Sequence, residues 1–142
     1  MKYSYIFINA TVALFLTLGL ISCQGKRSAD SSASGLKKIH FEFNSSSIEP
    51  EMAQILDNNA GYLKKHKDTE VVVEGHCDER GTNEYNLALG DRRAYSTKEY
   101  LLRKGVSSTH LRTVSYGEEK PLDNGHDEAS WYMNRRAEFE RQ

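Results

Sequence analysis

The stretch VVVEGHCDERGTNEYNLALGDRRA, residues 71–94, decides the fold of this chain. It opens with the valine run 71–73, which is typical of an interior strand covered on both faces. A loop with two glycines follows, and residues 84–104 then form a predicted helix that Gly105 ends. Leucine and alanine pairs repeat along this helix at seven-residue spacing. They predict a core face formed by Leu87, Ala88, Ala94, Tyr95, Leu101 and Leu102.

Four further segments complete the predicted domain. Residues 39–43 alternate apolar and polar side chains and predict a strand, and a helix begins at Pro50 and continues to about residue 65. Residues 111–116 and 135–140 predict two more strands, separated by a long loop with a helical turn near residues 127–133. The order strand–helix–strand–helix–strand–strand favours an α+β fold, a mixed four-stranded sheet covered by helices.

One acid and one base within the deciding stretch predict a binding site. Asp78 follows the central strand at its carboxyl end, where ligands of helix-covered sheets tend to bind. Asn86, Leu89 and Arg93 share one stripe of the following helix, beside its core face. Asp78 could hold an ammonium group and Arg93 a carboxylate, because the planar guanidinium binds carboxylates with two parallel hydrogen bonds. The pattern therefore favours a small zwitterionic ligand.

The loop before the helix adds donors to this site, but a structural interpretation stays open. Gly81 and Thr82 offer backbone N–H groups and a hydroxyl near the helix start, where carboxylates bind well. Asp78 could instead pair with Arg93 or Arg80 and only stabilise the loop.

The N-terminal region predicts an address in the cell envelope. Residues 6–21 are mostly apolar after a basic start, and the run ends in Leu20-Ile21-Ser22-Cys23, which resembles the lipobox of bacterial lipoprotein precursors. We expect residues 1–22 to be a signal peptide, Cys23 to be acylated, and Gln24 to favour the outer membrane. An uncleaved anchor or an ordinary secretion signal is the alternative. Residues 23–38 predict a flexible tether, and residues 39–142 the folded domain.

Composition and residue spacing argue against several other functions. The chain has a net charge of −1, which gives no reason to expect nucleic acid as a partner. Cys77 would be the one thiol left after lipidation, and His76 cannot readily activate it because neighbours on a strand point to opposite faces. We therefore expect no enzyme and no cofactor. We also expect no metal site, since the histidines lack the close pairing of zinc modules: His66, His76, His110 and His126.

Several sequence blocks resemble the peptidoglycan-binding signature of the OmpA-like family. The blocks are GHCDERGT at 75–82, YNLALG at 85–90, RRA at 92–94, VSYGEEKP at 114–121, GHDEA at 125–129 and NRRA at 134–137. The resemblance extends from about residue 39 to the end of the chain, in the family's order and spacing.

The resemblance implies roles for individual residues. Asp78 and Arg93 match the acid and base that hold meso-diaminopimelate in the peptide stem of the wall. At Asn44 the chain departs from the family, which usually has Asp there, and the charge of that side chain is lost. Further positions that match the lining of the family's pocket are Phe43, Arg80, Thr82, Asn86 and Leu89.

The resemblance also implies a function and partners. It implies a lipid-anchored outer-membrane protein that faces the periplasm and binds peptidoglycan non-covalently. It further implies a protein partner, the periplasmic propeller TolB, and other components of the Tol system that acts in envelope integrity and cell division. A protein-interaction module without direct wall binding is the alternative.

Overall fold

The structure is a computed structural model that describes residues 35–142. In this part of the chain the elements follow the predicted order, which confirms the α+β class. They are β1 (Ile39–His40), α1 (Pro50–Lys65), β2 (Val71–His76), α2 (Asn83–Arg103), the short 3₁₀ helix η1 (Ser108–His110), β3 (Leu111–Gly117), α3 (Glu128–Asn134) and β4 (Arg136–Arg141).

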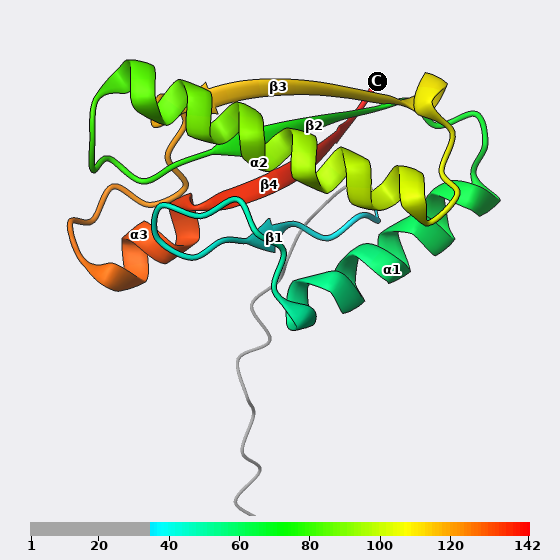
Figure 1. Cartoon of the computed structure of the whole chain (residues 1–142), viewed down its shortest axis with the longest axis horizontal. Helices are drawn as coiled ribbons and strands as arrows, with labels where there is room; N and C mark the ends of the chain where they lie inside the picture. The colour runs from blue at the N-terminus through cyan, green and yellow to red at the C-terminus, as the bar shows by residue number, and fades with distance from the viewer. Residues whose placement is uncertain (1–34) are drawn as a thin grey trace, which may run out of the picture.

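The four strands form one mixed sheet in the order β1-β4-β2-β3 (Figure 1). Strand β2 pairs in parallel with β3 and antiparallel with β4, and β4 also pairs antiparallel with β1. Strand β2 is therefore interior, as predicted. Helices α1 and α2 pack against the same face of the sheet, where one core joins them to the strands. Its larger members are Ile39, Phe41, Leu56, Leu63, Val71, Val73, Leu101, Leu111 and Phe139.

The prediction that β2 is covered on both faces was wrong. Val71 and Val73 face the helices, whereas Val72 and Glu74 are partly exposed on the opposite face. This opposite face of the sheet carries charged side chains, and it includes Glu138 of β4 directly across from Glu74.

The inner face of α2 also differs from the predicted one. Ala94 and Leu101 are buried as predicted, but Leu87 and Tyr95 are exposed. The buried stripe is shifted around the helix and contains the predicted site residues. That stripe is Asn86, Leu89, Gly90, Arg93, Ala94, Thr97 and Leu101. Apolar spacing was misleading because α2 approaches β2 through glycines and buries polar groups that find hydrogen-bond partners at the strand end.

The N-terminal boundary of the domain lies earlier than expected. Leu36 is buried in the core, and the backbone of Lys37 exchanges two hydrogen bonds with the Asn59 side chain, at 3.0 and 2.8 Å. This corrects the expected end of the tether at residue 38. The predicted signal peptide, the lipidation at Cys23 and the rest of the tether lie outside the described residues. Within residues 35–142, the helices are too short or too polar to span a bilayer.

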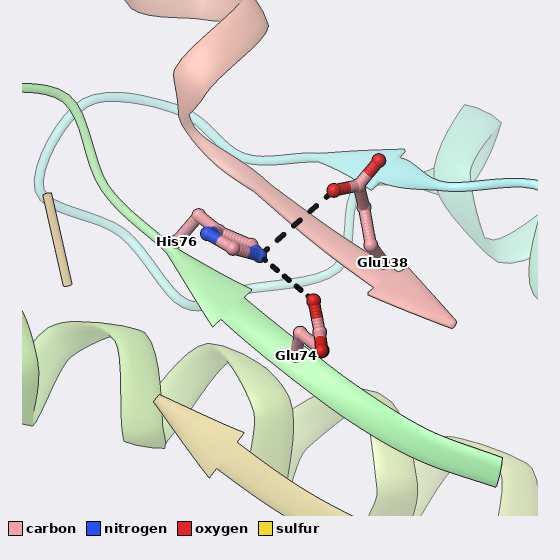
Figure 2. Close-up of side chains that lie close together, drawn as sticks. All are labelled: Glu74, His76 and Glu138. Atoms are coloured by element: carbon pink, nitrogen blue, oxygen red, sulfur yellow. Dashed lines mark ion pairs between the residues drawn. The ribbon is translucent and has the colours of Figure 1, made fainter. Parts of the chain in front are cut away.

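His76 is a buried histidine on the sheet face away from α2. Its side chain is 1% exposed, its two ring nitrogens have no hydrogen-bond partner, and its ring stacks on Tyr116. Burial and the charge of Arg136 together lower the pKa of His76 to about 3, so the imidazole is neutral at pH 7. Its Nε2 faces the carboxylates of Glu74 and Glu138 (Figure 2). Further charged groups that act on it are Arg136, Lys120 and Lys38.

This low pKa predicts a loss of stability in mild acid. Below pH 6.5 the unfolded chain takes up a proton at His76 that the folded chain refuses until about pH 3. The free energy of unfolding should therefore fall by about 2 kcal/mol between pH 7 and pH 5 through this group alone. Urea unfolding at pH 7 and at pH 5 measures this free energy, with a chelator present to remove trace metal ions. In His76→Gln, the free energy of unfolding should fall by about 2 kcal/mol less over this pH range than in the wild type. An equal fall in both proteins would refute the low pKa of His76.

Candidate functional site

A pocket of about 210 Å³ lies beyond the carboxyl end of β2. Its walls come from the loop after β1, the loop between β2 and α2, and the first turns of α2. Every predicted site residue except Thr82 lines it. The lining residues are Phe43, Asn44, Cys77, Asp78, Arg80, Gly81, Tyr85, Asn86, Leu89 and Arg93.

Thr82 has a structural role at the edge of this pocket. It is the N-cap of α2, and its hydroxyl oxygen accepts a hydrogen bond of 3.2 Å from the backbone N–H of Tyr85. A threonine cap satisfies one of the free N–H groups at a helix start. Thr82 thus fixes where α2 begins and does not line the pocket.

Asp78 is buried and is held by two arginines. Its Oδ1 accepts from the backbone N–H of Arg80 at 3.1 Å and from Arg80 Nε at 3.2 Å. Its Oδ2 accepts from Arg80 Nη2 at 2.7 Å and from Arg135 Nη1 at 3.3 Å. Burial alone would raise the pKa of Asp78, but these bonds outweigh it and lower the pKa below the ordinary value. Asp78 is therefore a carboxylate at neutral pH.

Arg80 covers Asp78 from the solvent side. Its guanidinium carbon lies 4.1 Å from the ring centroid of Phe43 and 4.1 Å from that of Trp131, so the group is sandwiched between two aromatic rings. The Arg80 side chain remains 30% exposed. Stacking on aromatic rings orients an arginine while leaving its edge free for carboxylates. Of the predicted alternatives for pairing with Asp78, the structure shows the Arg80 pair.

Arg93 is fully buried and does not pair with Asp78. Its Nε donates to the Ser45 carbonyl at 2.8 Å, Nη1 to the His76 carbonyl at 2.8 Å, and Nη2 to the Glu42 carbonyl at 3.1 Å. Burial lowers the pKa of Arg93, but a guanidinium stays charged in proteins. A bidentate interaction with a ligand carboxylate would require Arg93 to release one of these hydrogen bonds. Arg93 therefore contributes to the pocket wall its positive charge and the second Nη2–H, which the bond to Glu42 does not use.

These bonds predict that Arg93→Ala lowers stability. The expected loss in the free energy of unfolding is about 2 kcal/mol, because the buried His76 carbonyl loses its partner while the loop carbonyls regain water. Denaturant unfolding measures it, with Arg92→Ala on the exposed side of α2 as the control. Equal stability of the two variants would contradict this structural role.

Asn86 and Cys77 close the inner end of the pocket. The Asn86 amide donates to the backbone carbonyls of Asp78 and Arg80 at 3.2 and 3.3 Å and to Glu118 Oε2 at 2.5 Å. The Cys77 thiol donates to the Asn86 carbonyl at 3.2 Å, and burial raises the pKa of that thiol. His76 contacts Glu74 and Tyr116 on the other side of the sheet. Cys77 and His76 therefore do not form a nucleophile–base pair.

Asn44 lies at the pocket rim with a left-handed backbone, at a φ of 52°. Asparagine and aspartate adopt this conformation more readily than other side chains. The Asn44 Oδ1 accepts a hydrogen bond from the Tyr85 hydroxyl. An amide is thus sufficient for this structural contact.

Sequence reasoning missed Cys77 and Tyr85 in the pocket lining, and it missed two residues that hold Asp78 and Arg80 from behind that lining. Arg135 is 2% exposed and joins Asp78 to Glu128, with Nη2–Oε1 at 2.6 Å, and Trp131 forms one side of the Arg80 sandwich. Both come from the end of the chain, and no local pattern placed them near Asp78. The available signal was an arginine pair at the start of a strand whose Ala137 and Phe139 are core residues.

Comparison with known proteins identifies the family. The sequence matches the OmpA family over residues 40–135. A peptidoglycan-associated lipoprotein of Pasteurella multocida is 56% identical over 99 residues, which are 70% of this chain and 66% of that protein. The protein of that name from Rhizobium meliloti is 39% identical over 146 residues, 89% of this chain and 83% of the relative.

Solved structures agree with this fold. The crystal structure of the peptidoglycan-associated lipoprotein from Burkholderia pseudomallei superposes with a TM-score of 0.72 at 44% identity, over 74% of this chain and 89% of that one. The C-terminal domain of Helicobacter pylori MotB shares the fold, with a TM-score of 0.71 at 24% identity, over 76% of this chain and 85% of that one. The chain is not an enzyme, since its relatives are named as wall-associated lipoproteins. This protein belongs to the OmpA family and, within it, to the peptidoglycan-associated lipoproteins.

Proposed function

We propose that this protein is an outer-membrane lipoprotein that binds peptidoglycan non-covalently through the diaminopimelate of the stem peptide. The relatives named above support association with peptidoglycan. The observation that carries the finer proposal is that Asp78 and Arg93 line one pocket without being paired to each other. Opposite charges held apart by the backbone can each bind one group of a zwitterion.

The charges of the pocket favour a ligand that presents a carboxylate together with an ammonium group. Asp78 is the one carboxylate among the lining residues, and Arg80 and Arg93 both line the pocket with it. The excess of positive charge suits a carboxylate, and Asp78 suits an ammonium group. The far end of diaminopimelate carries both groups on one carbon.

Ligand binding by this route requires Arg80 to move. The lone-pair directions of Asp78 are taken by Arg80 and Arg135, so an incoming ammonium must replace at least one Arg80 bond. Arg80 is the partly exposed partner, whereas Arg135 is buried and also bound to Glu128 and to the Phe41 carbonyl. The released guanidinium of Arg80 then binds the ligand carboxylate while it stays between Phe43 and Trp131.

The proposed mechanism is a mechanical link across the periplasm. Acyl groups on Cys23 hold one end in the outer membrane, on the periplasmic side, and several acyl chains together give a firm anchor. The pocket holds the wall at the other end. TolB and other components of the Tol system are the proposed protein partners, in envelope integrity and cell division.

Two types of purified wall test the proposal. The protein should cosediment with sacculi whose stem peptides contain diaminopimelate, and about 10- to 100-fold more weakly with sacculi that contain lysine instead. Lysine lacks the distal carboxylate, and a charge-assisted hydrogen bond contributes about 1.5–3 kcal/mol. Equal binding to both walls would refute the proposal that the pocket recognises the distal carboxylate. Binding to neither would favour a protein-interaction module without direct wall binding.

A further inference from the structure

A second cluster of ligating side chains lies on the sheet face away from α2. Glu74 and His76 are two residues apart on β2 and so point to the same face, and Glu138 lies directly opposite Glu74 on β4 (Figure 2). One ligand atom from each of the three side chains lies within 4.8 Å of the others. Two paired strands hold the backbone positions of this cluster.

His76 is aimed into the cluster without a hydrogen-bond partner. Its Nε2 lies 3.6 Å from Glu74 Oε2 and 3.9 Å from Glu138 Oε2, which is too far for hydrogen bonds. The side chain is 1% exposed, so neither ring nitrogen is compensated by bulk water. A buried polar group without a partner is costly, and a ligand on Nε2 would remove part of that cost.

The protonation states of the three side chains suit a cation. The imidazole is neutral at pH 7, which is the form that binds metals. Burial would raise the pKa of Glu138, but Arg136 and Lys38 outweigh it and keep this side chain ionised. Burial raises the pKa of Glu74 above its ordinary value, a penalty that a bound cation would relieve.

We propose that Glu74, His76 and Glu138 bind one divalent transition-metal ion, for which Zn²⁺ has the best-matched chemistry. Zinc accepts imidazole nitrogen and carboxylate oxygen as ligands, and a set of three protein ligands leaves its fourth position to water. Ligand atoms at tetrahedral zinc lie about 3.3 Å apart for bonds of about 2.0 Å. The two nitrogen–oxygen distances therefore need to shorten by only a few tenths of an ångström, which the partly exposed glutamates can provide.

Two positively charged side chains, Lys38 and Arg136, affect the affinity for the metal ion. Lys38 Nζ lies 3.1 Å from Glu138 Oε1, and Arg136 Nη2 lies 2.9 Å from Glu138 Oε2. Both compete with the ion for the same carboxylate, so removal of the Lys38 charge should strengthen metal binding. Histidine spacing alone cannot reveal such a site, because two of its three proposed ligands are glutamates.

Calorimetric titration of ZnCl₂ into the full-length protein tests this proposal. The protein is purified in detergent without a histidine tag and stripped of metal with a chelator. We expect one Zn²⁺ per chain with a dissociation constant below about 100 µM. Glu74→Gln and Glu138→Gln should each weaken binding by about 100-fold, since outer-sphere partners alone contribute 10- to 100-fold. Lys38→Gln should strengthen it several-fold.

A matched control separates this site from exposed histidines. His126 Nδ1 lies 2.7 Å from Glu79 Oε1 on the surface, and that pair could bind zinc weakly. His126→Gln should leave the titration unchanged, and NMR of the imidazole nitrogens should show the zinc-induced shift at His76. The proposal is overturned if the wild-type constant is above about 100 µM, if the two glutamate variants bind like the wild type, or if the shift appears at His126.

Discussion

Replacing Asp78 with asparagine should lower the affinity for diaminopimelate-containing walls by about 100-fold. The substitution keeps the shape of the side chain but removes the charge that binds the ligand ammonium. Loss of such a charge-assisted contact costs about 1.5–3 kcal/mol, and 2.7 kcal/mol corresponds to about 100-fold. Cosedimentation with purified sacculi over a range of protein concentrations gives the affinity.

A matched variant makes this result specific. Asp91 is exposed on α2 and does not line the pocket, so Asp91→Asn should bind walls like the wild type. Circular dichroism and thermal unfolding of both variants show whether they fold, because Asp78 also binds the buried Arg135. A folded Asp78→Asn variant with unchanged wall affinity would mean that the pocket is wrongly assigned.

Adding one methyl group at Gly75 should destabilise the domain by more than about 4 kcal/mol. A Cβ at this position would lie 1.9 Å from the carbonyl oxygen of Gly90 and 2.6 Å from its carbonyl carbon. Both are backbone atoms of α2, so the whole helix must move away from β2. Losses above 4 kcal/mol are rare and are typical of overpacked cores and strained backbones. Thermal and denaturant unfolding of Gly75→Ala measure the effect.

Gly61 provides the matched control for this substitution. It lies within α1, and a Cβ there meets no atom within 4 Å. Alanine is favoured over glycine in a helix by about 1 kcal/mol, so Gly61→Ala should be neutral or stabilising. A Gly75→Ala protein as stable as Gly61→Ala would show that the close approach of α2 to β2 is not required.

The elements of the fold were predictable because their signals are local. The valine run 71–73, Pro50 at the start of α1 and Gly105 after α2 each follow from backbone preferences of nearby residues. The inner face of α2 was not predictable from apolar spacing. The buried Asn86 and Arg93 are tolerated only because carbonyls and carboxylates from distant segments accept their hydrogen bonds.

The sequence predicted most residues that line the candidate pocket, but not how they pair. Asp78 and Arg93 were placed at one pocket from their positions at a strand end and on a helix stripe. That Arg80 and Arg135 hold Asp78, and that Arg93 binds backbone carbonyls, depends on the loop 42–45 and on the chain after α3. Contacts of such long sequence separation leave no periodic pattern in a single sequence.

Titration of a diaminopimelate-containing stem peptide into the full-length protein, followed by NMR, tests the zwitterion pocket most directly. We predict saturable shifts of the Arg80, Asn86 and Arg93 side-chain signals, with a shift of the Trp131 indole N–H as Arg80 rearranges beside it. The lysine-containing peptide should produce much smaller shifts at the same concentrations. Unchanged signals at these four residues, or equal shifts with both peptides, would contradict the account.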